Sequence, residues 1–379
     1  MSSPNHLLYI TDAAIPSRQA NSIQTMKMCE AFCHAGLKVT LIVPDRSQEE
    51  VEDIWDYYDV QSEFEIVRLP WKPGERYLFS LMAPIEVRKI DPDLVYARFL
   101  PPAFFSSYLG YRTVFEAHYP MADDQFIIEL MFRLLILSGR LHQLVVISGP
   151  LYEDYLERYP QLSADHLTTA HDASSEIGDV EAVDLSTSDK LQVGYVGHLY
   201  EGKGMSLIAE LVKECSWAEF HIVGGTEEDI QYWRSKLASY SNISFHGHVP
   251  PKEVPRYHKA MDILLAPYQQ RVFGSSGEIE ISRWMSPLKI FEYMAARKPI
   301  LCSDIPVLRE IFCCHSEVLC DPSDVAEWVD ELRYYRDHPD KAEELGSRLH
   351  DHFQERFTYG ARAKHILGKI GINGKCSEY

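Results

Sequence analysis

One stretch of the sequence, Ser286 to Asp304 (SPLKIFEYMAARKPILCSD), restricts the fold of the chain more than any other. Phe291, Met294 and Ala295 fall at positions i, i+3 and i+4, which is the spacing of a helix face that packs inward. The apolar residues 299–302 follow directly and are typical of a strand. A helix that leads into a buried strand indicates a parallel α/β sheet.

The start of this helix carries groups that suit a phosphate. Pro287 is compatible with a first helical turn, because its missing N–H group leaves no hydrogen bond unmade there. Backbone N–H groups from Ser286 through Leu288 to Lys289 form a helix N-terminus that attracts anions, and the Lys289 side chain adds a positive charge. Glu292, about one turn later, can accept charge-assisted hydrogen bonds from sugar hydroxyls. These features favour a nucleotide or nucleotide sugar, although an ordinary capped helix explains the same residues equally well.

The pattern SPLKxFEYMAxxKPI resembles a signature of the retaining glycosyltransferases of family 4 (glycosyl transferases group 1), in their SPLK-type branch. The resemblance implies the GT-B architecture, an α/β fold in which two Rossmann-like domains face a cleft and a C-terminal helix crosses back to the N-terminal domain. Family members usually carry two glutamates with seven residues between them, and Glu292 matches the second, which binds the donor's ribose. Trp284 stands where the first would be, which changes how the donor sugar is read. Glu278 or Glu280 could replace it, but acids in loops are usually only solvated.

The strand-and-helix pattern occurs in both halves of the chain and predicts two domains. Residues 1–173 are expected to form an N-terminal Rossmann-like domain on the acceptor side. Residues 174–189 are polar and acidic and read as a linker. Residues 190–357 are expected to bind the nucleotide sugar, and residues 358–379 to form the helix that returns to the N-terminal domain.

The loop after the first predicted strand holds two candidate cleft residues. It spans residues 12–21 and lacks the Gly-Gly pair that the family often has there. Arg18 and Asn21 could still direct polar groups into the cleft. Capping of the following helix by Asn21 or Ser22 is the more ordinary role.

Two further candidates lie where predicted strands end, and ligands of open α/β sheets collect outside the carboxyl ends of the strands. Arg98 lies near the end of the strand 93–99, and an ion pair with a surface acid explains it equally well. His118 ends the strand 112–118, in a stretch resembling the family segment that carries a cleft histidine. The resemblance implies that His118 hydrogen-bonds the donor's hydroxyls, although a lone histidine is usually structural.

A glycine-bearing loop opens the second half. Gly197, His198, Gly202, Lys203 and Gly204 lie between a predicted strand and helix, where glycines let the backbone approach a phosphate and a lysine adds charge. The run YVGHLYEGKG resembles the family's donor-diphosphate loop, although the family's usual arginine aligns near His198.

The resemblance also assigns base contacts to His248 and Val249, at the end of the third strand of this half. His171 and Asp172 stand where the family often shows Asn-Gly-Val-Asp, beside the crossing between domains.

The composition excludes several classes of protein. The net charge of −19, from 37 basic and 56 acidic residues, argues against a nucleic-acid partner and weakly against docking on anionic lipid. Local basic patches could still exist on such a chain. No signal peptide is evident, and the apolar run Phe126 to Leu137 is too short and too charged to span a bilayer. The eight cysteines show no zinc spacing, so a cytoplasmic protein with reduced thiols is expected. Peripheral membrane contact and oligomeric state stay open.

These features lead to three hypotheses. The first is a retaining, metal-independent glycosyltransferase that moves a sugar from a UDP or GDP sugar to a hydroxyl acceptor in glycan or polysaccharide biosynthesis, with no cofactor beyond the donor. Lys203, Lys289, Glu292 and His118 would carry the chemistry. The second is a nucleotide-sugar epimerase of the same fold, which would convert its substrate without an acceptor. The third is a non-catalytic subunit that binds nucleotide sugars without transferring the sugar.

Overall fold

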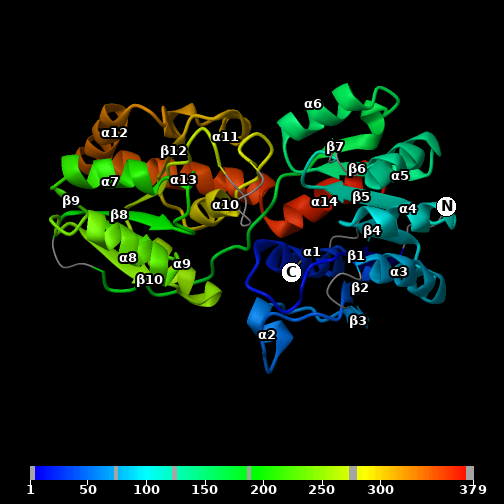
Figure 1. Cartoon of the computed structure of the whole chain (residues 1–379). Helices are drawn as coiled ribbons and strands as arrows, with labels where there is room; N and C mark the ends of the chain where they lie inside the picture. The colour runs from blue at the N-terminus through cyan, green and yellow to red at the C-terminus, as the bar shows by residue number, and fades with distance from the viewer. Residues whose placement is uncertain (1–4, 72–75, 122–125, 186–188, 273–279, 373–379) are drawn as a thin grey trace. The chain divides into compact units, whose positions relative to one another are not determined.

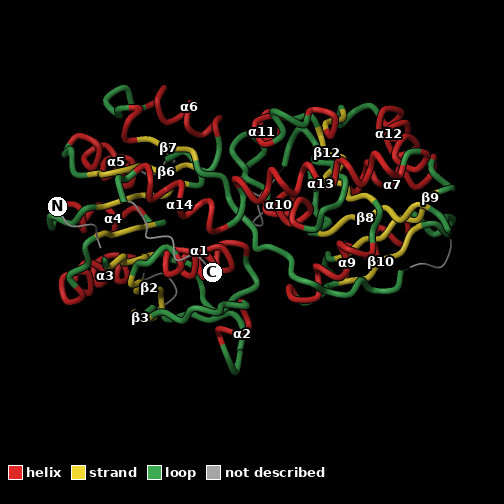
Figure 2. The backbone as a smooth tube through the Cα atoms, turned by 180° about the vertical axis from the view of Figure 1, so that it is seen from behind, coloured by secondary structure: helices red, strands yellow, loops and turns green. Residues whose placement is uncertain are grey.

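The computed structural model of the chain describes residues 5–71, 76–121, 126–185, 189–272 and 280–372. The chain divides into two compact units, which are coloured along the sequence in Figure 1. Unit 1 comprises residues 1–173 together with 359–379, and unit 2 comprises residues 174–358. The backbone tube of Figure 2 shows one group of yellow strands in each unit.

Unit 1 is built on a seven-stranded parallel sheet in the order β3-β2-β1-β4-β5-β6-β7. The strand order reverses between β1 and β4, which is where open α/β sheets offer a binding crevice. The strands are β1 (His6–Ile10), β2 (Lys38–Pro44), β3 (Glu65–Leu69), β4 (Leu94–Ala97), β5 (Thr113–Ala117), β6 (Leu141–Val146) and β7 (Leu167–Thr169).

The helices of unit 1 cover this sheet and include one from the C-terminal end of the chain. They are α1 (Ala20–His34), α2 (Ile54–Tyr58), α3 (Arg76–Ile90), α4 (Leu100–Tyr108), α5 (Phe126–Leu137), α6 (Gly149–Arg158) and α14 (Tyr359–Lys369), with the 3-10 helix η1 (Ala164–His166). The helix α14 packs on α1, and Ala363, Ile366 and Leu367 join the same buried core as Met28 and Phe32. The predicted return of the C-terminal helix to the N-terminal domain is therefore confirmed.

Unit 2 repeats the design with a six-stranded parallel sheet in the order β10-β9-β8-β11-β12-β13. The strands are β8 (Leu191–Val196), β9 (Ala218–Val223), β10 (Ile243–Gly247), β11 (Ile263–Ala266), β12 (Ile300–Ser303) and β13 (Leu319–Cys320). The helices are α7 (Met205–Glu214), α8 (Glu227–Lys236), α9 (Val254–Ala260), α10 (Leu288–Ala295), α11 (Pro306–Ile311), α12 (Val325–Asp337) and α13 (Pro339–Arg356), with η2 (Pro251–Glu253) and η3 (Ser316–Val318). Two parallel Rossmann-like sheets confirm the predicted fold class.

Local chemistry explains where several elements differ from the prediction. The helix α1 begins at Ala20, and its N-cap is Gln19, whose side chain makes no capping bond. The predicted cap by Asn21 or Ser22 is therefore wrong, because Ser22 instead donates to the carbonyl of Ala14 at 2.7 Å. The strand β7 lies where no separate strand was expected, since its three residues are too few to show a period. In the described part of the chain, no helix has the length and apolar character needed to cross a membrane.

Candidate functional site

The turn after β8 leaves room for a lysine side chain from α10. Gly197 has a φ of +147°, and a Cβ atom built on it would lie 3.0 Å from the Nζ of Lys289 and 3.5 Å from the hydroxyl of Tyr195. Glycine at this position therefore lets the amine approach the backbone of the turn. The Tyr195 hydroxyl donates to the carbonyl of His198 at 2.6 Å and holds the turn in place.

The amine of Lys289 is buried among aromatic rings. Its Nζ lies 3.9 Å from the ring centroid of Tyr195 and 5.1 Å from that of Tyr268, and it has no hydrogen-bond partner among the described residues. Burial, reinforced by the charge of Lys203 and opposed by that of Glu292, holds the pKa of Lys289 well below its usual range. An ammonium kept from water without a hydrogen-bonded anion is costly, so this position favours binding of an anionic ligand.

Lys203 brings a second amine to the same rings. Its Nζ lies 5.5 Å from the ring centroid of Tyr268 and 5.4 Å from that of Tyr200. Burial lowers the pKa of Lys203 to about 8. The ring of His198 stacks on Tyr200, and burial together with the charges of Lys203 and Lys289 lowers the pKa of His198. A neutral His198 therefore does not supply the positive charge of the family's usual arginine.

The remaining glycines of this loop bring its backbone against the loop after β11. A Cβ atom on Gly202 would meet the backbone of Arg271, and one on Gly204 would meet the carbonyl of Pro267. Gln269 reinforces this contact, because its backbone N–H donates to the carbonyl of Gly202 at 3.0 Å and its side-chain Oε1 accepts from the N–H of Gly202 at 3.1 Å. Gly204 then serves as the N-cap of α7. The two loops form one support for the lysines.

The helix α10 starts at Leu288, and Pro287 is its N-cap residue, so Pro287 precedes the first turn instead of lying in it. No side chain caps this helix end, whereas Ser286, just before it, is buried. Lys289 and Glu292 lie about one turn apart on this helix. Glu292 is half-buried, and burial raises its pKa against the opposing charge of Lys289.

The replacements suggested for the missing first glutamate differ in outcome. Glu280 is ion-paired with Arg271 at 3.0 Å and accepts a hydrogen bond from Ser282 at 2.9 Å, at an exposed position. The structure thus favours the surface role for Glu280, and Glu278 lies outside the described residues. Trp284 stands in a turn before α10, and Val249 follows the end of β10 as expected, beside an exposed His248.

In unit 1, the predicted cleft residues have different surroundings. The side chain of Arg18 is 56% exposed and pairs with Glu49 at 3.0 Å, so it behaves as a surface ion pair. Asn21 is exposed in the first turn of α1, and its carbonyl accepts hydrogen bonds from Thr25 at 2.8 Å and Arg98 at 3.3 Å. Arg98 and His118 instead come together behind the ends of β4 and β5.

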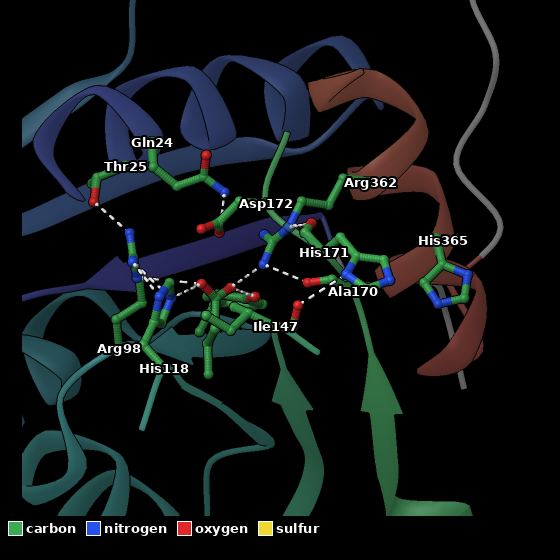
Figure 3. A network of polar contacts seen from close by, with 12 residues as sticks. Gln24, Thr25, Arg98, His118, Ile147, Ala170, His171, Asp172, Arg362 and His365 are labelled. Atoms are coloured by element: carbon green, nitrogen blue, oxygen red, sulfur yellow. Dashed lines mark hydrogen bonds and ion pairs between the residues drawn. The ribbon is translucent and has the colours of Figure 1, made fainter. Parts of the chain in front are cut away.

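A buried carboxylate, Glu116, holds Arg98 and His118 in a polar cluster, and Figure 3 labels these two partners. Its Oε1 lies 2.6 Å from the Nε2 of His118 and 3.3 Å from the Nε of Arg98. Its Oε2 lies 3.1 Å from Arg362 of α14 and accepts from the hydroxyl of Tyr96. Burial opposes ionisation, but the charges of Arg362 and Arg98 and the hydrogen bond from His118 outweigh it and hold the pKa of Glu116 well below its usual range.

The cluster also includes Arg362 of α14 and residues 170–172, which follow β7. Arg362 also donates to the carbonyls of His171 at 2.7 Å and Ala170 at 3.3 Å. Asp172 accepts from the amide of Gln24 on α1 at 3.1 Å. Figure 3 shows these side chains converging from α1, from the ends of the strands and from α14. Asp172 therefore lies near His118, with side-chain ligand atoms within 4.8 Å, whereas His171 joins the cluster through its carbonyl and Arg362.

Glu116, His118 and Asp172 bring possible ligand atoms within 4.8 Å of one another. Both oxygens of Glu116 already face guanidinium groups, at 3.3 Å from Arg98 and 3.1 Å from Arg362. A divalent cation would have to share these oxygens with two positive charges. The donor set fits a salt-bridge cluster rather than a metal centre, and we assign no metal to it.

Sequence reasoning missed the residues that support the candidates. Glu116 stands two residues before His118, and side chains with this spacing on a strand point to the same face. This spacing was the sequence signal that could have identified Glu116. Arg362, Tyr195 and Tyr268 come from distant parts of the sequence and carry no local pattern that marks them.

Two comparisons with known sequences bear on the class of the protein. Residues 206–368 match a family model described as glycosyl transferase-like. A curated relative of Bacillus subtilis (strain 168), named as the teichuronic acid biosynthesis glycosyltransferase TuaH, is 27% identical over 124 residues. That match spans 32% of this chain and 29% of the relative.

Solved structures match almost the whole chain. Sucrose-phosphate synthase of Thermosynechococcus elongatus gives a TM-score of 0.70 at 15% identity, over 96% of this chain and 98% of that one. Anabaena Alr3699/HepE in complex with UDP gives a TM-score of 0.69 at 12% identity, over 97% and 99%, and its complex with UDP-glucose gives 0.66.

The fold therefore defines a GT-B protein. The match of residues 206–368 to a glycosyl transferase-like model agrees with the resemblance of the SPLK stretch.

Proposed function

We propose that the protein transfers a sugar from UDP-sugar to a hydroxyl acceptor with retention of the anomeric configuration, in the synthesis of a glycan or polysaccharide. The observation that carries this proposal is the pair of amines in unit 2. Lys203 and Lys289 share the ring of Tyr268 and have no ion-pair partner among the described residues. They lie next to a glycine loop and the N-terminus of α10, which are features that bind diphosphate. The structural neighbour HepE was solved in complex with UDP and with UDP-glucose, which supports uridine as the base.

In the proposed reaction, the two amines stabilise the negative charge that develops on the leaving diphosphate. Preorganised positive groups in a site shielded from water often contribute the largest share of catalysis. An arriving diphosphate favours the charged form of each lysine, because a nearby negative charge raises the pKa of an amine. Glu292 accepts hydrogen bonds from the ribose hydroxyls. The resemblance to the retaining family suggests front-face attack, in which the departing phosphate takes the acceptor's proton.

For unit 1 we propose a role in binding sugar hydroxyls. Arg98 and His118 stand at the carboxyl ends of β4 and β5, where ligands collect in such sheets. Glu116 fixes the orientation of both side chains. His118 would act as a hydrogen-bonding group rather than as a strong base.

A thermal-shift screen of UDP, GDP, ADP and their sugars tests the choice of donor. A ligand present at about 100 times its Kd adds roughly 2.7 kcal/mol of stability, so the right nucleotide raises the midpoint of unfolding clearly. Lys203→Ala and Lys289→Ala should each lose most of the shift by UDP and lower turnover at least about tenfold. Lys213→Ala, at an exposed position of α7, is the matched control. Unchanged UDP binding in both site variants would refute the diphosphate role.

A second experiment separates the proposed activity from its alternatives. Glu292→Ala should raise the KM for the donor more than it lowers kcat, because the ribose contact is present in substrate and transition state alike. NMR of the product shows whether the anomeric configuration is retained. An epimerised nucleotide sugar in the absence of acceptor would indicate an epimerase. Tight UDP binding without transfer to any acceptor in a broad panel would indicate a non-catalytic subunit.

A further inference from the structure

The helix α5 has an unusual distribution of exposure. Its sequence, FIIELMFRLLIL, is apolar on all sides, and its two charged residues, Glu129 and Arg133, pair with each other at 2.6 Å. Helices of this composition are normally buried. Here only Phe132 and Leu135 are buried, whereas Phe126, Ile127, Leu137, Leu130 and Leu134 are 75%, 65%, 67%, 43% and 39% exposed.

The neighbouring helices extend this apolar surface. On α3, Leu81 and Ile85 are 59% and 56% exposed. The sequence of α4 holds no charged residue, and Tyr108 at its end is 45% exposed. The helix α4 packs against both α3 and α5, and the Tyr108 hydroxyl donates to the carbonyl of Leu134 at 3.2 Å. Figures 1 and 2 both show the three helices side by side, and we call their exposed apolar side chains the α3–α5 face.

The charge around this face is opposite to that of the chain. Residues 76–90, 100–112 and 126–140 hold six Lys and Arg residues and two Glu residues. Removing these from the chain's 37 basic and 56 acidic residues leaves 31 and 54, so the remainder carries −23 and the three segments carry +4. Asp123 and Asp124, just before α5, and Asp91, which follows α3 and accepts a hydrogen bond from Tyr111 at 3.0 Å, are counted in the remainder. Arg88, Lys89 and Arg140 are exposed.

We propose that the α3–α5 face docks on an anionic lipid bilayer, with the leucine, isoleucine and phenylalanine side chains entering the acyl boundary and the basic residues meeting the headgroups. An exposed apolar area of this extent marks an interaction site. Apolar residues flanked by Lys and Arg are the pattern of interfacial helices that bind anionic membranes. A second copy would instead set two positively charged faces against each other, because a two-fold interface uses the same surface twice.

The test is cosedimentation of the full chain with vesicles of pure phosphatidylcholine and of phosphatidylcholine mixed with phosphatidylglycerol. Binding should be stronger to the mixed vesicles and should weaken at high salt. The variant Phe126→Ser with Leu130→Ser should reduce the partition coefficient at least about tenfold. Neutralising Arg88→Gln with Lys89→Gln should remove most of the preference for phosphatidylglycerol.

Matched controls lie on unit 2. Tyr232→Ser with Tyr334→Ser removes two large side chains of similar exposure, 51% and 44%, and should leave the partition unchanged. Arg333→Gln with Lys341→Gln is the control for charge. Thermal unfolding should be unaltered in the Phe126 and Leu130 variant, because the replaced side chains are exposed.

The proposal is wrong if the chain binds neither kind of vesicle. It is also wrong if the Phe126 and Leu130 variant binds the mixed vesicles as strongly as the unchanged chain does. Sedimentation velocity distinguishes the competing occupant. If the chain forms a dimer that this variant dissociates, and no vesicle binds, a second copy covers the face and the lipid proposal is wrong.

Discussion

Among single residues, Lys203 and Lys289 show how a site can be prepared for an anion before the anion arrives. Both amines lie against the ring of Tyr268, and burial lowers the pKa of each. Cation–π contacts compensate only part of the lost hydration. A diphosphate would compensate the rest, so part of the binding free energy reflects relief of this cost.

This arrangement predicts a pH dependence for UDP binding. Burial lowers the pKa of Lys203 from its ordinary value of 10.5 to about 8. The free protein therefore loses this charge as the pH rises through about 8, and the Kd for UDP should increase by up to about tenfold per pH unit above that point. Calorimetry in buffers of different ionisation enthalpy should show net proton uptake on binding. The stability of the ligand-free protein depends on pH in the opposite sense. The unfolded chain holds the Lys203 proton up to about pH 10.5, so the free energy of unfolding rises as the pH increases from about 8 to about 10.5.

Replacement by arginine isolates this effect. Lys203→Arg keeps a charge that does not titrate, so the slope of Kd with pH should become shallower, leaving the contribution of Lys289. Lys203→Met should weaken UDP binding below pH 8 and remove its share of the proton uptake. An unchanged slope in both variants would contradict the assignment.

A second prediction concerns Glu116, whose side chain is fully buried between Arg98 and Arg362. Glu116→Gln keeps the shape but leaves two buried guanidinium groups without their anion. Breaking a buried ion pair from one side costs about 3–5 kcal/mol. Denaturant unfolding should show this loss, whereas Glu86→Gln, at the surface pair with Lys89, should change stability by less than about 1 kcal/mol.

The sequence could suggest residues for the candidate site, but not the side chains that surround them. Lys203, Lys289 and Glu292 lie within short motifs whose spacing indicates phosphate and hydroxyl binding. The rings of Tyr195 and Tyr268 are brought to Lys289 by the pairing order β9-β8-β11-β12 in the sheet, which no local pattern encodes. Arg362 reaches Glu116 only because α14 packs on α1. Side-chain partners of this kind follow from topology and are not visible in a single sequence.

At the scale of elements, the loop after β8 depends on glycine for two separate reasons. Gly204 has a φ of +107°, and a Cβ atom there would meet the carbonyl of Pro267. Gly204→Ala should destabilise the protein by roughly 2–5 kcal/mol, from backbone strain and from steric overlap with a backbone atom. Gly247→Ala is a matched control, because its φ is +74° but nothing lies within 4 Å of the added Cβ atom. A loss of only about 1–2 kcal/mol is expected there, and equal losses in the two variants would show that the contact with Pro267 is unimportant.

Element boundaries show what hydrophobic spacing can and cannot predict. The apolar run Phe126 to Leu137 forms α5, and the strand predicted at 299–302 is β12 at Ile300–Ser303. The cap of α1 was wrongly assigned to Asn21 or Ser22, because Ser22 bonds to Ala14 across the loop, a contact that spacing does not predict. The length and charge of this run exclude a membrane span, but they do not predict that its apolar side chains are exposed, which is a property of the whole unit.

For the whole molecule, α14 follows unit 2 in the sequence but belongs to unit 1 in the structure. The family match covers residues 206–368 and so includes α14, yet this helix belongs to unit 1. The chain passes between the units at residues 173–174 and again at 358–359. The sequence of residues 359–370 indicates only that they form a helix. The assignment of this helix to the first unit came from the family resemblance.

A chain that ends at Thr358 tests how the two units depend on α14. Unit 1 would lose Arg362, the partner of Glu116, and the core contacts of Ala363, Ile366 and Leu367. Unit 2 keeps all of its described residues. We expect a calorimetric scan to show unit 1 unfolding at a much lower temperature, while UDP still raises the midpoint of a separate transition.

Lys369→Ala in the full chain, at the exposed end of α14, should leave both transitions in place. If the shortened chain unfolded in one transition that UDP no longer shifted, the donor site could not be a property of unit 2 alone. The lysines would then need residues of unit 1 to hold the diphosphate. If UDP still shifts the second transition, binding of the nucleotide and the integrity of the Glu116 cluster are independent, and loss of transfer in the shortened chain would assign unit 1 to the acceptor.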